Sequence, residues 1–63
     1  MPQPPRPPEL RAMQQSKHWV ALKPIFDIGY TDARRGHWEN NQPARSLRWY
    51  AYEAGHDKGR DEE

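Results

Sequence analysis

The stretch PIFDIGYTDARRG, residues 24–36, decides the fold, because its apolar and small residues recur at spacings of three and four positions. That recurrence places them on one face of a helix, with charged residues on the other face. The shared face holds Phe26, Gly29, Tyr30 and Ala33. Proline suits the first position of a helix, and glycine suits the left-handed position just past its end. The pattern therefore predicts a helix that begins at Pro24, runs to about Arg35 and is ended by Gly36.

A second stretch, YAYEAGHDKG at residues 50–59, repeats this arrangement when Gly55 is aligned with Gly29. The same alignment pairs Tyr52 with Phe26, His56 with Tyr30 and Gly59 with Ala33. A glycine inside a helix costs about 1 kcal/mol relative to alanine, so a close approach of two backbones is expected to offset the cost. The alternative is that both glycines end shorter helices. We favour two helices that pack closely through their small residues.

The second helix is predicted to begin at Pro43, with Asn41 or Gln42 as its N-cap, and to end at Gly59. Its apolar residues follow the spacing i, i+3, i+4, i+7 of an amphipathic helix. HWENNQ, residues 37–42, then forms the turn of an antiparallel helical hairpin. The predicted packing residues of the hairpin are Phe26, Gly29, Tyr30, Ala33, Leu47, Tyr50, Ala51, Ala54 and Gly55.

The N-terminal part of the chain is predicted to be an arm followed by one more helix. Residues 1–8, MPQPPRPP, favour an extended or disordered arm, because proline fixes φ and lacks an amide donor. Residues 9–22 favour a helix, with Ser16 as the cap of a turn within it. The residue before a proline is disfavoured in the helical conformation, so we expect a break or a kink at Lys23.

Length and charge bound the architecture. At 63 residues the chain holds one small domain at most. We expect an all-α domain over residues 9–59 and a disordered acidic tail over residues 60–63. Residues 1–56 carry eight Lys or Arg and five Asp or Glu, whereas residues 57–63 carry two and four. A core this small with surplus aromatic residues is compatible with a homodimer.

The composition also bears on the compartment. The chain contains no cysteine, which excludes disulfides and thiolate metal sites and fits a reducing environment. No apolar run approaches the ~20 residues that a membrane-spanning helix needs, so we expect no membrane partner. These features together lead us to expect a cytoplasmic protein.

No combination of residues predicts catalysis or cofactor binding. His18, His37 and His56 lie nineteen residues apart each time, without the paired spacing of a metal site. Asp27 and Asp32 do not share a helix face, as an acid/base pair on one helix would require. The glycines are too dispersed to form a phosphate-binding loop. We therefore expect a non-catalytic protein that carries no metal and no cofactor.

A basic surface is predicted around the loop end of the hairpin. Its residues are Lys23, Arg34, Arg35, Arg45 and Arg48, with Trp38 in the loop between them. An exposed tryptophan beside arginines can stack on a nucleic-acid base or anchor in a protein pocket. The alternative is that Trp38 packs back over the hairpin and the arginines form a solvated face.

These features resemble ribosome modulation factor and its short relatives. The shared pattern is a helix with a glycine–tyrosine–alanine stretch and a following glycine, a polar turn with a proline, and a second helix with a tryptophan and a later glycine–aromatic pair. In this chain the matching residues are Gly29, Tyr30, Ala33, Gly36, Pro43, Trp49, Gly55 and His56. The resemblance covers residues 26–59. It implies two antiparallel helices, binding to ribosomal RNA and protein, and a role in translation regulation.

Two functional classes follow from these observations. The first is a regulator that binds RNA or the ribosome. The second is a small protein of the kind encoded by phages or mobile elements, which binds and inhibits a host protein complex. Phosphate contacts would make affinity fall steeply with rising salt, which marks the first class. A protein partner that survives nuclease treatment marks the second.

Overall fold

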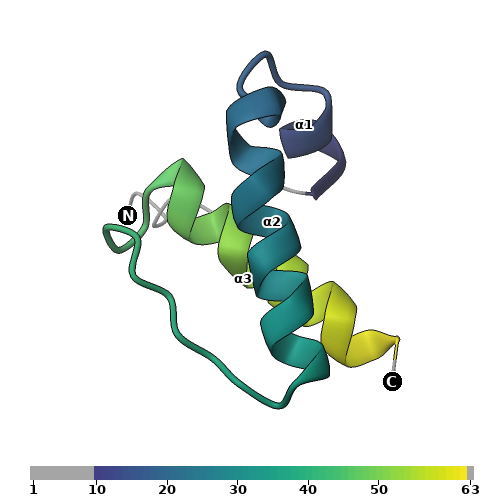
Figure 1. Ribbon diagram of the computed structural model, residues 1–63. Coiled ribbons are helices and arrows are strands. Elements are labelled where there is room, and N and C mark those ends of the chain that lie inside the picture. Colours follow the sequence, from purple (N-terminus) through teal and green to yellow (C-terminus); the bar gives the residue numbers. More distant parts are fainter. Residues whose placement is uncertain (1–9, 63) are drawn as a thin grey trace, which may run out of the picture.

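The computed structural model describes residues 10–62, which form three α-helices (Figure 1). They are α1 (Leu10–Gln14), α2 (Trp19–Arg34) and α3 (Leu47–Asp61). This part of the chain contains no strand, which confirms the predicted all-α class. The predicted proline-rich arm over residues 1–8 lies outside the described residues.

The segment predicted as one helix over residues 9–22 divides into α1 and the beginning of α2. Residues 15–18 form a turn between them, in which the Ser16 hydroxyl accepts a hydrogen bond from the backbone N–H of His18 at 3.1 Å. The backbone carbonyl of Ser16 accepts from the N–H of Trp19 at 3.0 Å, where α2 begins. Ser16 therefore caps the turn that holds His18, as predicted, whereas the N-cap of α2 itself is His18, whose side chain makes no capping hydrogen bond.

Pro24 lies inside α2, which is continuous from Trp19 to Arg34, so the predicted helix start at Pro24 and the predicted break at Lys23 are wrong, whereas the kink at Lys23 stays a prediction. A proline in a helix removes the hydrogen bond to the carbonyl of the residue four positions earlier, here Val20. Both residues are on the exposed face of α2, and Val20 is 86% exposed, so water can reach the freed carbonyl. We infer that packing of the opposite face outweighs the local cost of the proline.

The adjoining ends of α2 and α3 are set by one glycine and one serine. Gly36 adopts a φ of 68°, the left-handed conformation predicted for the residue that ends the first helix. α3 begins at Leu47 rather than at Pro43, because Ser46 is its N-cap and accepts a hydrogen bond from the N–H of Trp49 at 3.1 Å. The predicted start at Pro43 is therefore wrong.

α3 continues past Gly59 to Asp61, so Gly59 does not end the helix as predicted. Residues 60–61 were predicted to be part of a disordered tail, but they belong to the last turn of α3. Gly59 is buried, and a Cβ atom added to it would lie 2.7 Å from the carbonyl oxygen of Tyr30. The glycine at this position permits close packing rather than a change of direction.

α2 and α3 run in the same direction, so the predicted antiparallel hairpin is wrong (Figure 1). Gly55 lies on the backbone of Phe26. Gly59, one turn further along α3, lies on the backbone of Tyr30, one turn further along α2. Contact positions that increase together along both helices define a parallel pair.

The contacts between the two helices are reciprocal. Gly29 lies on the backbone of Tyr52, which is three residues before Gly55. Gly55 in turn lies on the backbone of Phe26, which is three residues before Gly29. Each repeated stretch therefore presents the same surface to the other, and the predicted close approach through glycines is confirmed. We call Gly29, Gly55, Gly59 and the backbone that they contact the glycine interface.

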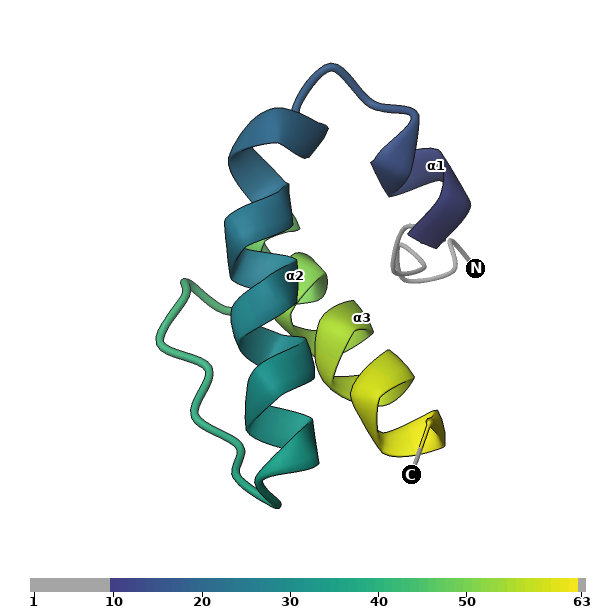
Figure 2. The ribbon, with the colours of Figure 1, turned by 45° about the vertical axis from the view of Figure 1, so that its right-hand side comes forward.

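The connection between α2 and α3 is long enough to return along the pair. Figure 2 shows it running back beside α2 to the start of α3. Nine residues, 37–45, can span at most about 30 Å at roughly 3.3 Å per residue, and the turn closed by the Ser46 N–H and the Pro43 carbonyl shortens this reach. The 16 residues of α2 rise only about 24 Å. A parallel arrangement is therefore within reach of this loop, and we call residues 37–42 the return segment.

The core lies between the three helices. Its buried apolar residues are Met13, Leu22, Phe26, Ala33, Ala51 and Tyr52. Met13 of α1 contacts the cluster that contains Leu22 and Ala51, so α1 covers one end of the helix pair. The predicted packing residues are buried or half-buried with one exception. Leu47 is 46% exposed and does not belong to the interface.

Candidate functional site

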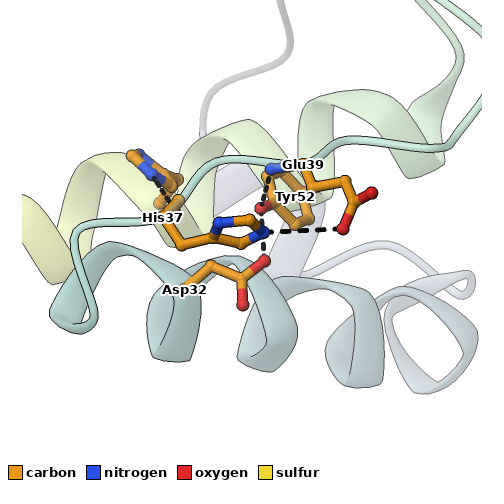
Figure 3. Close-up of polar contacts among 5 residues, drawn as sticks. Asp32, His37, Glu39 and Tyr52 are labelled. Atoms are coloured by element: carbon orange, nitrogen blue, oxygen red, sulfur yellow. Dashed lines mark hydrogen bonds and ion pairs between the residues drawn. The ribbon is translucent and has the colours of Figure 1, made fainter.

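The return segment is fastened to both helices by the hydroxyl group of Tyr52 (Figure 3). This hydroxyl donates a hydrogen bond to Oδ2 of Asp32 on α2 at 2.5 Å and accepts one from the backbone N–H of Glu39 at 2.8 Å. Burial raises the pKa of Tyr52, and the hydrogen bond to Asp32 raises it further, while the Glu39 N–H opposes both. The phenol is therefore held in its neutral form as a structural link.

Further side chains on α3 hold the same segment. The Nε2–H of His56 donates to the carbonyl oxygen of His37 at 2.9 Å. Glu53 accepts hydrogen bonds from the indole of Trp38 at 3.0 Å and from the amide of Asn40 at 3.3 Å. These polar groups position the loop. Among residues 10–62, no three His, Asp or Glu side chains gather closely enough to hold a metal ion.

The predicted basic residues are divided between two ends of the molecule. Arg34 and Arg35 lie at the C-terminal end of α2, whereas Arg45 and Arg48 lie at the N-terminal end of α3. Because the helices are parallel, these two ends are far apart (Figure 1). Lys23, the fifth residue, forms an exposed ion pair with Asp27 at 3.6 Å. The structure does not bring these cations together into one surface.

Trp38 lies in the return segment and is 53% exposed. Its ring contacts Tyr52 edge to face with the centroids 6.3 Å apart, while its indole N–H is engaged by Glu53. This is the folded-back position that the sequence left open as an alternative.

A groove of about 650 Å³ lies between α1 and the outer face of α3. It is lined by Leu10, Trp49, Tyr50, Glu53, Ala54, Asp57, Lys58, Asp61 and Glu62. Trp49 and Tyr50 pack edge to face, with their ring centroids 5.2 Å apart. The groove thus combines an aromatic pair with four carboxylates and one amine, and we call it the α3 groove.

The carboxylates of the α3 groove are positioned by neighbouring groups. Asp57 forms an exposed ion pair with Arg60 at 3.0 Å. Glu62 accepts a hydrogen bond from the hydroxyl of Tyr30 on α2, and this bond raises the pKa of Tyr30. Glu53 is held by the return segment, as described above. Three of the four carboxylates of the groove therefore contact a neighbouring group, on α2, on α3 or in the return segment.

The sequence analysis missed this groove. No prediction was made for the charged outer face of α3, and residues 60–63 at its end were expected to be disordered. A signal was present, because Glu53, Asp57 and Asp61 follow the spacing i, i+4, i+8 that aligns side chains along a helix. The position of α1 beside this row was not visible in the sequence.

No protein-family model, no curated protein and no solved structure matches the chain. The resemblance to the ribosome modulation factor family therefore stays a prediction. In the part of the chain that the structure describes, no helix combines the length and the apolar character needed to cross a membrane.

Proposed function

We propose that the chain is a small non-catalytic protein-binding module, which holds a basic segment of a partner protein in the α3 groove. The observation that carries this proposal is the combination of Trp49 and Tyr50 with the carboxylate row of α3 in one groove. Within the two classes left open by the sequence, the proposal belongs with the small protein that binds and inhibits a protein complex. The cysteine-free composition is consistent with a cytoplasmic partner.

The chemistry of the groove favours lysine or arginine side chains on the partner. Aromatic rings attract cations over their faces and supply much of the binding energy in protein interfaces. Carboxylates accept charge-assisted hydrogen bonds from guanidinium and ammonium groups. Asp57 and Asp61 flank Lys58 on this surface, so acidic groups outnumber the single cation in the middle of the groove.

The same features give less support to RNA as the main ligand. A phosphate-binding surface gathers cations on one face, because each contact releases counterions from the nucleic acid. Here the arginines lie at two ends of the helix pair, and the groove is acidic. RNA or ribosome association is accordingly treated as an outcome of the experiment below.

The test uses two matched substitutions, Asp57→Lys in the groove and Asp27→Lys on the outer face of α2. Both aspartates are about equally exposed, at 63% and 59%, and each forms an ion pair with a basic residue on its own helix. Tagged chains are used to capture partners from a lysate treated with nuclease. We expect a stoichiometric protein partner to be retained by the wild type and by Asp27→Lys, and to be lost from Asp57→Lys.

Circular dichroism of both variants verifies that they fold. Loss of every partner on nuclease treatment would overturn the proposal in favour of RNA association. Retention of the same partner by Asp57→Lys would place the binding surface elsewhere on the molecule. Salt dependence was expected to mark the RNA class, but contacts between the acidic groove and a basic protein segment would also weaken with rising salt, so nuclease treatment is the measurement that separates the two classes.

A further inference from the structure

We propose that residues 1–9 of the same chain, MPQPPRPPE, occupy the α3 groove and compete with the partner. The inference rests on the groove of the proposed function, but it concerns an interaction within one chain and is tested without any partner. Three features carry it: the point where the arm joins the described residues, its length, and its chemistry.

The arm joins the described part of the chain at the groove itself. Leu10, the first described residue, is one of the groove-lining residues and follows Glu9 directly. No intervening linker has to be crossed, so the arm starts beside the surface that it would contact. A tether of this kind gives a local concentration in the millimolar range for a short flexible connection.

The length of the arm matches the length of the groove. A proline-rich segment in the polyproline II conformation rises about 3.1 Å per residue, so nine residues span about 28 Å. The groove extends along α3 from Trp49 to Glu62, a rise of about 20 Å at 1.5 Å per residue. The arm is therefore long enough to lie along the whole groove, from the aromatic pair Trp49 and Tyr50 to the carboxylates at the end of α3.

The chemistry of the arm fits the lining. Five of its nine residues are prolines, and proline-rich segments dock in grooves lined by aromatic rings. Arg6 is its one basic side chain, and the groove offers Glu53, Asp57 and Asp61 as acceptors. Because proline already fixes φ, ordering the arm costs less conformational entropy than ordering an ordinary segment.

Occupation of the groove by the arm would lower the affinity for a basic partner. If the effective concentration of the arm about equals its own dissociation constant, the arm occupies half of the grooves, and the apparent affinity for a partner falls about two-fold. The arm would thus select against weakly binding partners. A partner would displace it by offering more cations or more contact with the aromatic rings than Arg6 and the prolines supply.

The test uses paramagnetic broadening in the full-length chain. The chain contains no cysteine, so Gln3→Cys creates a single site for a nitroxide label in the arm. We expect the Trp49 indole resonance and the amides of Glu53 and Asp57 to lose most of their intensity. The amides of Val20 and Ile28, on the exposed face of α2, serve as the internal control and should keep theirs. Equal broadening at both sets would overturn the proposal.

A charge exchange tests the role of Arg6. Arg6→Glu in the labelled chain should restore intensity at the groove, and adding Asp57→Lys to it should bring the broadening back. If Arg6→Glu leaves the broadening unchanged, an arginine-directed docking is excluded. Mixing labelled chains with unlabelled ¹⁵N chains separates the two possible sources of the arm. Broadening in the unlabelled copy would overturn docking within one chain and assign the groove to a second copy.

Failure of this inference and failure of the proposed function give different results. If the arm does not dock but Asp57→Lys still loses the partner, the groove binds proteins without internal competition. If the arm docks but no protein partner depends on Asp57, the groove belongs to the arm, and the proposed function is wrong.

Discussion

The glycine interface and the return segment hold the same two helices together in opposite ways. In the glycine interface, Gly29 and Gly55 bring backbone directly against backbone, and side chains contribute almost nothing at the points of contact. In the return segment, the contacts are hydrogen bonds between polar side chains and the backbone, centred on Tyr52. The glycine interface therefore depends on steric fit between two backbones, whereas the return segment depends on specific hydrogen bonds.

The two regions should therefore respond differently to small changes. A backbone contact cannot move aside, so one added methyl group has no space to enter. A hydrogen bond contributes about 1 kcal/mol on average, and losing one leaves the remaining contacts of the segment in place. We expect any added side-chain atom in the glycine interface to cause a large loss of stability. Substitutions in the return segment should cause smaller losses that depend on how many hydrogen bonds are removed.

The largest effect is expected for Gly55→Ala. Alanine normally favours a helix over glycine by about 1 kcal/mol, but here the added Cβ would overlap the carbonyl oxygen and carbon of Phe26. Overpacking of this kind costs 1–3 kcal/mol or more, and backbone atoms cannot relieve it by changing rotamer. We expect a loss of about 3 kcal/mol or more in the free energy of unfolding, measured by urea denaturation.

Lys58→Ala is the control, because it replaces an exposed residue of the same helix and should change stability by less than about 0.5 kcal/mol. Gly29→Ala should resemble Gly55→Ala, since its added Cβ would overlap the carbonyl oxygen of Tyr52. A wild-type level of stability in either glycine variant would mean that the helices are further apart in solution, and the parallel interface described here would not hold.

The next effect in size is expected for Tyr52→Phe. The substitution keeps the buried ring but removes the hydroxyl, which leaves the Glu39 N–H and the Asp32 carboxylate without their partner. We expect a loss of about 1–3 kcal/mol, because unpaired polar groups add to the lost hydrogen bonds. Hydrogen exchange at the Glu39 amide should accelerate more than exchange in α2.

The pH dependence of stability provides the control for Tyr52→Phe. The pKa of Tyr52 is raised in the folded chain, so the neutral phenol stabilises the fold. This contribution is complete below the unfolded pKa of about 10 and is lost as the pH rises through the folded pKa. The wild type should therefore lose stability above pH 10 more steeply than Tyr52→Phe. Parallel curves would show that the hydroxyl is not engaged as described.

The glycine interface could be predicted from the sequence because its cause is local. Gly29 and Gly55 are each unfavourable inside their own helices. The repeated residues around them show which helix face offsets this cost by packing against the other helix. The same locality explains why Gly36 and Ser16 were correctly interpreted. Each of these residues has a conformational or capping preference that acts within a few positions along the chain.

The direction of the helices could not be predicted in this way. The spacing within each helix defines the face that packs, but the same face can pack against a parallel or an antiparallel partner helix. Direction depends on the return segment, which is fastened by Tyr52 to Asp32 and Glu39, residues that are far apart in the sequence. The polar loop with its two adjacent asparagines was interpreted as a turn because these long-range bonds leave no pattern in the chain.

The α3 groove was missed for a related reason. Its carboxylate row is visible at i, i+4 spacing, but a row of charges on a helix usually faces solvent. It becomes a groove only because Met13 places α1 against the core beside α3. Pro24 is a second case in which tertiary packing decides. Its local preference for the start of a helix is overridden by the packing of the whole of α2.

The smallest effects are expected at the two ends of the loop, where the backbone is left-handed. Gly36 has a φ of 68° with no neighbouring atom near its missing Cβ, and Arg45 has a φ of 65° in the turn closed by the Ser46 N–H and the Pro43 carbonyl. Left-handed backbone costs a residue with a Cβ about 1–2 kcal/mol, whereas glycine adds 0.5–1 kcal/mol of entropy to the unfolded chain.

Gly36→Ala should therefore lose about 1 kcal/mol, and Arg45→Gly should gain about 0.5 kcal/mol, because relief of the backbone exceeds the added entropy. Both are measured by urea denaturation against the wild type. A loss of stability in Arg45→Gly would mean that the arginine side chain itself holds the turn. The connection between α2 and α3 would then be held by the Arg45 side chain near α3 as well as by the Tyr52 hydroxyl, and its contrast with the glycine interface would be greater still.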